Sequence, residues 1–198
     1  MNKNPLPHRR RSIRLKEYDY SQPGAYFITI CTHHKIHLFA DAPNGEIILN
    51  QYGKIVEYTW RILPKRISGI ELNSYVIMPN HFHGILSIVD EPVGAGASTQ
   101  SPSNRSYAPA PTPDTKDCLV KKQTPLPEII RHFKTCSAIG INRLRGTTGK
   151  PVWQRGYYEH IIRDEIEFNN FASYIVNNPL KWELDKYFQD PDKATNHG

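Results

Sequence analysis

The sequence contains little cysteine and lacks long apolar runs. Its 198 residues include three cysteines, an odd number, and no two of them form a C-x-x-C pair. This argues against both a disulfide framework and a cysteine zinc site. No N-terminal apolar stretch is typical of a signal peptide, and no segment approaches the roughly 18 apolar residues of a membrane-spanning helix. We therefore expect a cytoplasmic protein that has no membrane partner.

Two segments contain no acidic residue and are rich in basic ones. Over the whole chain, 25 Lys and Arg exceed 19 Asp and Glu, which gives a formal net charge of +6. The two segments, 8–16 and 131–150, suit a polyanion, with nucleic acid ahead of an anionic membrane. Solvated tails and faces are the alternative interpretation. The side chains that we expect to contact DNA are Arg9, Arg10, Arg11, Arg14, Arg131, Lys134, Arg143 and Arg145.

The length predicts a single domain over residues 1–198, with a basic N-terminal arm (1–17) and an insertion (91–124). The insertion is rich in Pro, Ser and Ala and contains hardly a large apolar residue. It cannot bury enough surface to offset the entropy cost of ordering, so we expect it to be disordered. Strand and helix patterns continue after it, which makes it a loop within the domain.

Strand and helix patterns follow one another along the rest of the chain. Helices segregated against a mainly antiparallel sheet make an α+β fold, and we expect the helices to pack on one face of that sheet. The last helix has a start signal, because Asp164 is a plausible N-cap with Glu167 three residues later. The expected strands are 24–32, 36–39 and 46–49 around a turn at 43–45, two runs within 70–90 separated at 79–80, and two short runs within 151–163; the expected helices are 51–63, ended by Pro64, then 126–144 and 165–178.

Two histidines stand one residue apart in the apolar stretch "YVIMPNHFHGIL" (75–86). In a strand, His81 and His83 project from the same face, because side chains alternate. Two neutral imidazoles so placed can begin a site for a divalent metal. The strongly apolar flanks indicate a central strand, in which a polar pair needs a partner.

The last predicted helix offers that partner. Tyr174 and Asn178 are four residues apart, at the edge of the helix's apolar stripe. Asn178 supplies a carbonyl oxygen as a third ligand, and a mixed N/O site with open positions favours Mg²⁺ or Mn²⁺ over structural Zn²⁺. Tyr174 supplies a hydroxyl nucleophile. The alternative is a boundary tyrosine with a packed ring and a solvated hydroxyl.

At these residues the sequence resembles the single-tyrosine HUH transposases, specifically the bacterial REP-associated tyrosine transposases. "YSQPGAYFITICT" resembles the first-strand signature of that family, and "YVIMPNHFHGIL" resembles its metal-binding strand. "WQRGYYEHIIRDEIEFNNFASYIVNNPLKW" (153–182) resembles its C-terminal block. The three stretches occur in the family's order and span nearly the whole chain outside the insertion.

The resemblance implies a ferredoxin-like sheet and a function in DNA transposition. By it, His81, His83 and Asn178 are metal ligands and Tyr174 is the nucleophile, which cleaves and rejoins single-stranded DNA through a 5′-phosphotyrosine. The implied partner is a palindromic DNA hairpin with a single-stranded flank, bound by a monomer or a homodimer associated with the nucleoid. Within the C-terminal block, His160 and Glu159 are candidates for assisting proton transfer, although a structural hydrogen bond is as reasonable.

Two other functions remain open from the residues. The chain can be a catalytically inactive module that binds structured DNA or RNA through its basic surfaces. It can also be a metal-dependent nuclease that uses an activated water, with Tyr174 serving only to pack the helix.

Overall fold

A computed structural model describes residues 18–90, 124–184 and Tyr187. The predicted N-terminal arm (1–17) and positions 91–123 of the predicted insertion lie outside the described residues. No helix among the described residues is both long and apolar enough to cross a membrane.

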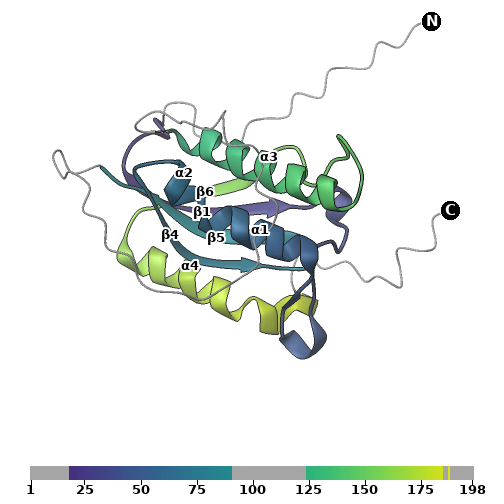
Figure 1. The fold of residues 1–198 in the computed structure, drawn as a ribbon. Helices are drawn as coiled ribbons and strands as arrows, with labels where there is room; N and C mark the ends of the chain where they lie inside the picture. The colour runs from purple at the N-terminus through teal and green to yellow at the C-terminus, as the bar shows by residue number, and fades with distance from the viewer. Residues whose placement is uncertain (1–17, 91–123, 185–186, 188–198) are drawn as a thin grey trace, which may run out of the picture.

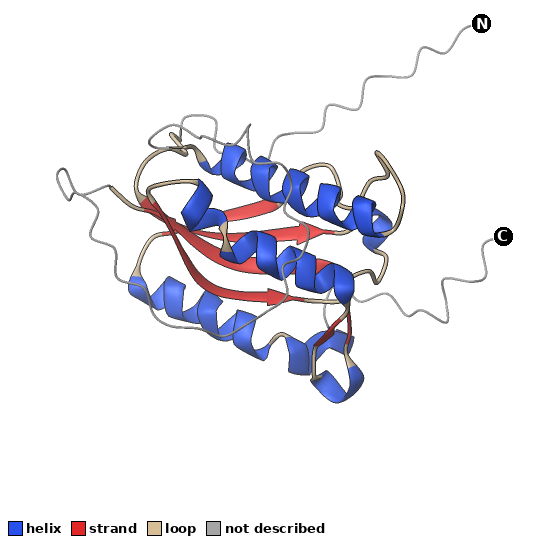
Figure 2. Cartoon of the chain, in the orientation of Figure 1, coloured by secondary structure: helices blue, strands red, loops and turns tan. Residues whose placement is uncertain are grey.

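A four-stranded antiparallel sheet is the centre of the fold (Figures 1 and 2). Its strands are rich in β-branched and aromatic residues, which suit a pleated, buried surface. The strands, in their spatial order, are β4 (Ile70–Ile77), β5 (His81–Ile88), β1 (Gly24–Cys31) and β6 (Tyr158–Ile162). The strand that carries the two histidines is therefore central, as the apolar flanks predict.

In the part of the chain that the structure describes, four helices accompany the sheet, together with three short 3₁₀ segments and a second, two-stranded sheet. The helices are α1 (Gln51–Arg61), α2 (Leu63–Arg66), α3 (Leu126–Leu144) and α4 (Glu165–Asn177). The 3₁₀ segments are His33–Lys35, Pro43–Gly45 and Pro179–Leu184, and the small sheet pairs β2 (Ala40–Asp41) with β3 (Ile48–Leu49). The expected α+β class with an antiparallel sheet is confirmed.

The helices cover both faces of the sheet, and the expectation of a single covered face is wrong. One buried cluster joins alternate residues of β1, such as Tyr26 and Ile28, to α1 and α3. A second cluster joins Phe27 of β1 and Ile85 of β5 to Ile175 of α4. Figure 1 shows α4 separated from α3 by the strands. The reason is that the central strand is apolar on both sides, so each face needs a cover.

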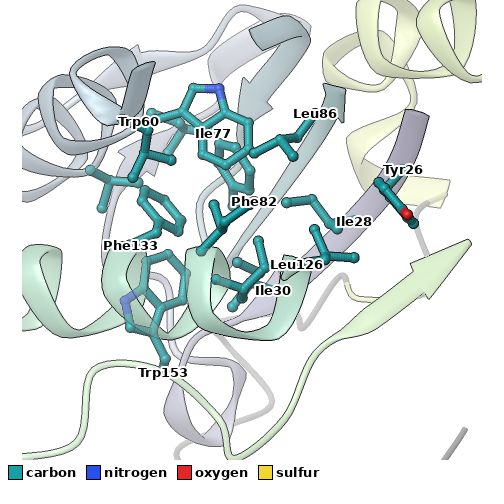
Figure 3. Close-up of a cluster of buried hydrophobic side chains, with 14 of the residues drawn as sticks. Tyr26, Ile28, Ile30, Trp60, Ile77, Phe82, Leu86, Leu126, Phe133 and Trp153 are labelled. Carbon is teal, nitrogen blue, oxygen red and sulfur yellow. The ribbon is translucent and has the colours of Figure 1, made fainter. Parts of the chain in front are cut away.

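The larger cluster is an aromatic core between the sheet and α1 and α3 (Figure 3). Phe82 of β5 packs against Trp60 of α1, at a ring-centroid distance of 4.7 Å, and against Phe133 of α3, at 5.2 Å. Trp153 closes one end, where its indole N–H donates to the Ser137 hydroxyl at 3.0 Å. Phe82 therefore anchors β5 on this face, which leaves its neighbours on the strand to face α4.

Three predicted elements differ from the structure. Residues 36–39 form no strand, because the N–H groups of Leu38 and Phe39 donate to the Pro79 carbonyl instead of a sheet partner. Pro64 does not end helical structure, since it lies in the first turn of α2, where its missing N–H costs little. In the 151–163 segment, a single bridge from Trp153 to Thr32 replaces the first predicted strand.

Candidate active site

His81 and His83 lie on the sheet face that α4 covers. Strand pairing sets Thr29 of β1 opposite His83 and Cys31 opposite His81. Both histidines are buried, with exposed fractions of 0% and 1%, and their ring centroids are 4.5 Å apart. The prediction that this H-x-H pair projects from one face is therefore confirmed.

Each imidazole has a hydrogen-bond partner at Nδ1. His83 Nδ1 lies 2.7 Å from the Thr29 hydroxyl oxygen, and His81 Nδ1 lies 2.8 Å from Asn80 Oδ1. The His83 ring also stacks on Phe27 at 5.4 Å. These contacts hold both rings from their Nδ1 side, which is how proteins commonly orient a histidine that binds through Nε2.

Helix α4 brings a tyrosine hydroxyl to the same place. The helix starts as predicted, because the Asp164 side chain accepts from the Glu167 N–H at 2.7 Å. Its apolar stripe, which includes Phe171 and Ile175, packs on the sheet. The Tyr174 hydroxyl then lies 3.4 Å from His83 Nε2, although 91 residues separate the two in sequence.

An open cleft of about 830 Å³ runs along α4 beside this contact. Tyr174 is 39% exposed and faces the cleft, whereas Asn178, at the C-terminal end of the helix, is 3% exposed and contributes to the cleft wall. The wall combines aromatic rings with amides, one lysine and one carboxylate. Its residues are Phe27, Thr29, His83, Tyr158, Glu167, Asn170, Phe171, Ser173, Tyr174, Asn177, Asn178, Lys181 and Leu184.

Two aromatic residues after α4 complete the surroundings of the histidines. The Tyr187 ring lies 4.8 Å from His81 and 6.2 Å from His83. Trp182 is buried with its ring 5.9 Å from His81. The place of Tyr187 could not be predicted from the sequence, because no periodic pattern connects this position to a strand about a hundred residues earlier.

The two residues proposed to assist proton transfer lie on opposite faces of the sheet. His160 pairs with Phe27 and therefore faces α4, where its Nε2 lies 2.7 Å from a Glu167 carboxylate oxygen. Glu159 pairs with Ile28 and faces the other side, so the register does not bring it to the cleft. The Arg163 N–H and then His160 lower the pKa of the Glu167 carboxyl.

The basic residues of the second acid-free segment divide into two kinds. Arg131 and Arg143 are exposed on α3. Lys134 Nζ instead donates to the carbonyls of Gln154 and Gly156, at 2.7 and 2.8 Å, and burial lowers its pKa to about 8. Arg145 donates within its own loop, to Asn142, Thr147 and the Lys150 carbonyl. The four predicted arginines of the arm, Arg9, Arg10, Arg11 and Arg14, lie outside the described residues.

Among the described residues, no three His, Cys, Asp or Glu side chains form a group that could hold a metal ion. A third donor that these residues offer to a cation beside the histidine pair is therefore of another type. The amide of Asn178 in the cleft wall is such a donor, and amide oxygen is a ligand that Mg²⁺ and Mn²⁺ accept. The donor set of two imidazoles and one amide fits a hard or borderline divalent cation.

The fold and this site define an α+β protein with a paired-histidine strand facing a tyrosine-bearing helix. No family model matches the chain. A protein of Haemophilus influenzae, described only as uncharacterized, is 37% identical over 185 residues, which cover 92% of this chain and 95% of that protein. The chain belongs to the same family as that protein.

A solved structure of a REP-associated tyrosine transposase bound to a REP hairpin has a similar fold. The TM-score is 0.51, and the match covers 88% of this chain and 76% of that one. At 16% identity, this likeness shows a shared transposase-like fold.

Proposed function

We propose that the protein is a DNA transposase that cleaves and rejoins single-stranded DNA at hairpin-forming sites through a 5′-phosphotyrosine intermediate. The observation that carries this proposal is the 3.4 Å approach of the Tyr174 hydroxyl to Nε2 of the buried His83. A boundary tyrosine with a solvated hydroxyl has no need of that neighbour. A nucleophile does, because its target phosphate has to be held beside it.

His81, His83 and Asn178 are the residues that would hold Mg²⁺ or Mn²⁺. Both imidazoles are held at Nδ1 by protein groups, which leaves Nε2 as the ligating nitrogen of each. When bound, the cation would polarise the scissile phosphate and stabilise negative charge on the departing 3′ oxygen.

Tyr174 supplies the chemistry of the covalent step. Its phenolic oxygen attacks phosphorus in line and loses its proton, while the bond from phosphorus to the 3′ oxygen breaks and that oxygen leaves as a 3′-OH. The phosphotyrosine conserves the phosphodiester bond, so the 3′-OH of another strand can attack it, restore the phenol and join the two strands. No nucleotide cofactor is required.

The proposed partner is hairpin DNA with a single-stranded flank. Its support is the fold shared with a transposase whose structure contains a REP hairpin, together with the family resemblance of the three sequence stretches. The cleft is open along α4 and lined partly by aromatic rings, which suits unpaired bases that stack. We propose that this activity is exercised in the cytoplasm, at the nucleoid.

The contact between Tyr174 and His83 forms within one chain, and Asn178 of that chain lines the same cleft. A homodimer that exchanges the tyrosine helix is therefore unnecessary for the chemistry, and we propose that a monomer is competent to cleave.

A denaturing-gel assay tests the proposal. The substrate is a labelled pool of single-stranded DNA in which an imperfect palindromic stem has randomised flanks, incubated with the full chain and Mn²⁺. We expect a covalent protein–DNA adduct that requires the metal and disappears in Tyr174→Phe and His83→Ala. Tyr158→Phe removes another hydroxyl from the wall of the same cleft and should retain the adduct.

Three results contradict the proposal. An adduct that survives Tyr174→Phe excludes this nucleophile. Cleavage that leaves 5′-phosphate ends and no adduct indicates a nuclease with an activated water. Hairpin binding that is insensitive to His83→Ala, with no adduct under any metal, indicates an inactive binding module.

A further inference from the structure

Asn80, the residue directly before β5, makes hydrogen bonds with both the oxygen and the nitrogen of its side-chain amide. It is buried, with an exposed fraction of 0%. Its Nδ2 donates to two main-chain carbonyls, Lys35 O at 3.0 Å and Tyr187 O at 2.7 Å. Its Oδ1 lies 2.8 Å from His81 Nδ1. The amide therefore joins three segments that are far apart in the sequence.

This arrangement determines which nitrogen of His81 carries the proton. Carbonyl oxygens only accept hydrogen bonds, so the end of the amide that faces Lys35 and Tyr187 must be the NH₂ group. The end that faces His81 is then the oxygen, which also only accepts. His81 Nδ1 must therefore be the donor, and in the neutral ring the lone pair is on Nε2.

We propose that Asn80 is a positioning residue that holds His81 in the tautomer able to bind a cation through Nε2. The inference rests on the proposed function for its purpose, because it assumes that His81 is a ligand. It goes beyond that function by assigning a role to a side chain that is neither a proposed ligand nor the proposed nucleophile. The same amide also ties Tyr187 to the base of β5, so the orientation of His81 and the placement of that residue depend on one group.

The second histidine is held differently. The hydroxyl of Thr29 can donate or accept, so its 2.7 Å contact leaves both tautomers of His83 available. Nε2 of His83 accordingly can accept from the Tyr174 hydroxyl or donate to it. The hydrogen bond to Asn80 fixes the tautomer of His81, whereas the contact with Thr29 allows both tautomers of His83. We therefore assign the positioning role to Asn80 and not to Thr29.

The tautomer can be read directly in the metal-free protein. Long-range proton–nitrogen correlation spectra of the ¹⁵N-labelled full chain in EDTA distinguish a protonated from an unprotonated ring nitrogen. His81→Gln, which deletes one set of signals, assigns them. We expect His81 to carry its proton on Nδ1 in the wild type, and Asn80→Ala to populate the form protonated on Nε2. If the spectra show that wild-type His81 is protonated on Nε2, the proposal is wrong, whatever the spectra of the variants show.

Metal binding supplies the second readout. Loss of an orienting partner typically weakens metal affinity by about 10–100-fold, and we expect Asn80→Ala to weaken Mn²⁺ binding in calorimetry by that factor. Asn73→Ala is the matched control, because it removes an amide that donates to Ser87 on the same sheet, and it should change neither readout. Unchanged tautomer and unchanged affinity in Asn80→Ala contradict the positioning role.

The two proposals fail in different experiments. The tautomer measurement contains neither metal nor DNA, so it tests Asn80 even if the wild type forms no adduct. A wild type that binds no Mn²⁺ while His81 has the expected tautomer refutes the proposed metal-dependent function and with it the purpose that we assign to Asn80.

Discussion

Histidines at 0% and 1% exposure are costly unless their polar atoms are satisfied. A buried polar group without a partner costs about 1–3 kcal/mol, and two on one face of a central strand would weaken it. In the structure, Nδ1 of each buried ring has a hydrogen-bond partner, which is Asn80 for His81 and Thr29 for His83. The role in chemistry that we propose for both rings accounts for two imidazoles at buried positions of the sheet.

Gly84, next to His83, has no side chain, and this allows the aromatic core to pack closely against β5. A Cβ at this position would lie 2.8 Å from the Phe82 ring and 3.0 Å from Trp60. We expect Gly84→Ala to lower the free energy of unfolding by about 1–3 kcal/mol, the usual cost of overpacking. Urea unfolding measures this, with Gly24→Ala as the control, because its Cβ would meet nothing nearer than 3.8 Å. Equal stability of the two variants would contradict the packing described for this strand.

Lys134 gives a pH dependence with a definite sign. Burial lowers its pKa to about 8, whereas an unfolded lysine titrates near ~10.4. Between these values the unfolded chain binds more protons than the folded one, so this residue makes stability rise with pH. We expect Lys134→Met to remove that rise in urea unfolding measured from neutral pH to about pH 10. The exposed Lys54→Met should keep it, and a rise that persists in Lys134→Met would be inconsistent with the buried ammonium.

At the scale of elements, the position of α4 determines whether Tyr174 lies beside the two histidines. Tyr174 lies on this helix, and Asn178 follows directly after it. The packing of the helix on Phe27 determines how far both residues lie from the sheet. Phe27 stacks on Phe171 at 4.4 Å, which fixes the helix one turn before the tyrosine. A shift of the helix by one turn would carry the hydroxyl about 5.4 Å away from His83.

The start of α4 depends on Asp164. Its carboxylate accepts from the Glu167 N–H at 2.7 Å, which satisfies one of the donors that a helix end leaves open. We expect Asp164→Ala to lower the free energy of unfolding by about 1 kcal/mol, within a usual range of 0.5–2. Chemical denaturation checks this against Glu165→Gln, an exposed acid in the same first turn. A loss no larger than that of the control would argue against the cap.

The sequence predicted those elements whose signals are local. The H-x-H spacing placed both imidazoles on one strand face, and Asp164 with Glu167 marked the start of α4. The contacts of Asn80 could not be predicted, because its partners at Lys35 and Tyr187 are brought to it by tertiary folding. Periodicity also gives no information on which face of a sheet a helix covers, and this is why the expectation that all the helices share one face was wrong.

At the scale of the whole molecule, the cleft and α3 lie on opposite faces of one sheet. A DNA that touches both must pass an edge of that sheet. Arg131 and Arg143 of α3 are exposed, and we propose that they contact such a DNA, whereas Lys134 and Arg145 are engaged within the protein. The net charge of +6 favours this association at low salt.

The salt dependence of hairpin binding tests the role of α3. Each phosphate contact contributes about one unit to the slope of log affinity against log salt. We expect Arg143→Ser to reduce that slope by about 1 in fluorescence anisotropy titrations with a labelled DNA hairpin. Lys54→Ser removes an exposed charge from α1 and serves as the control. An identical slope in the wild type and Arg143→Ser would show that this part of α3 does not contact the DNA.

The central claim is that Tyr174 forms the covalent bond to DNA, although two other tyrosines lie in the cleft wall or beside the histidines. Tyr158 is exposed in the cleft wall, and the Tyr187 ring is 6.2 Å from His83. Tandem mass spectrometry of the proteolysed Mn²⁺-dependent adduct identifies the modified residue directly. Our account predicts a 5′-nucleotide on the peptide that contains Tyr174; a nucleotide on Tyr158 or Tyr187, or on no tyrosine, would contradict it.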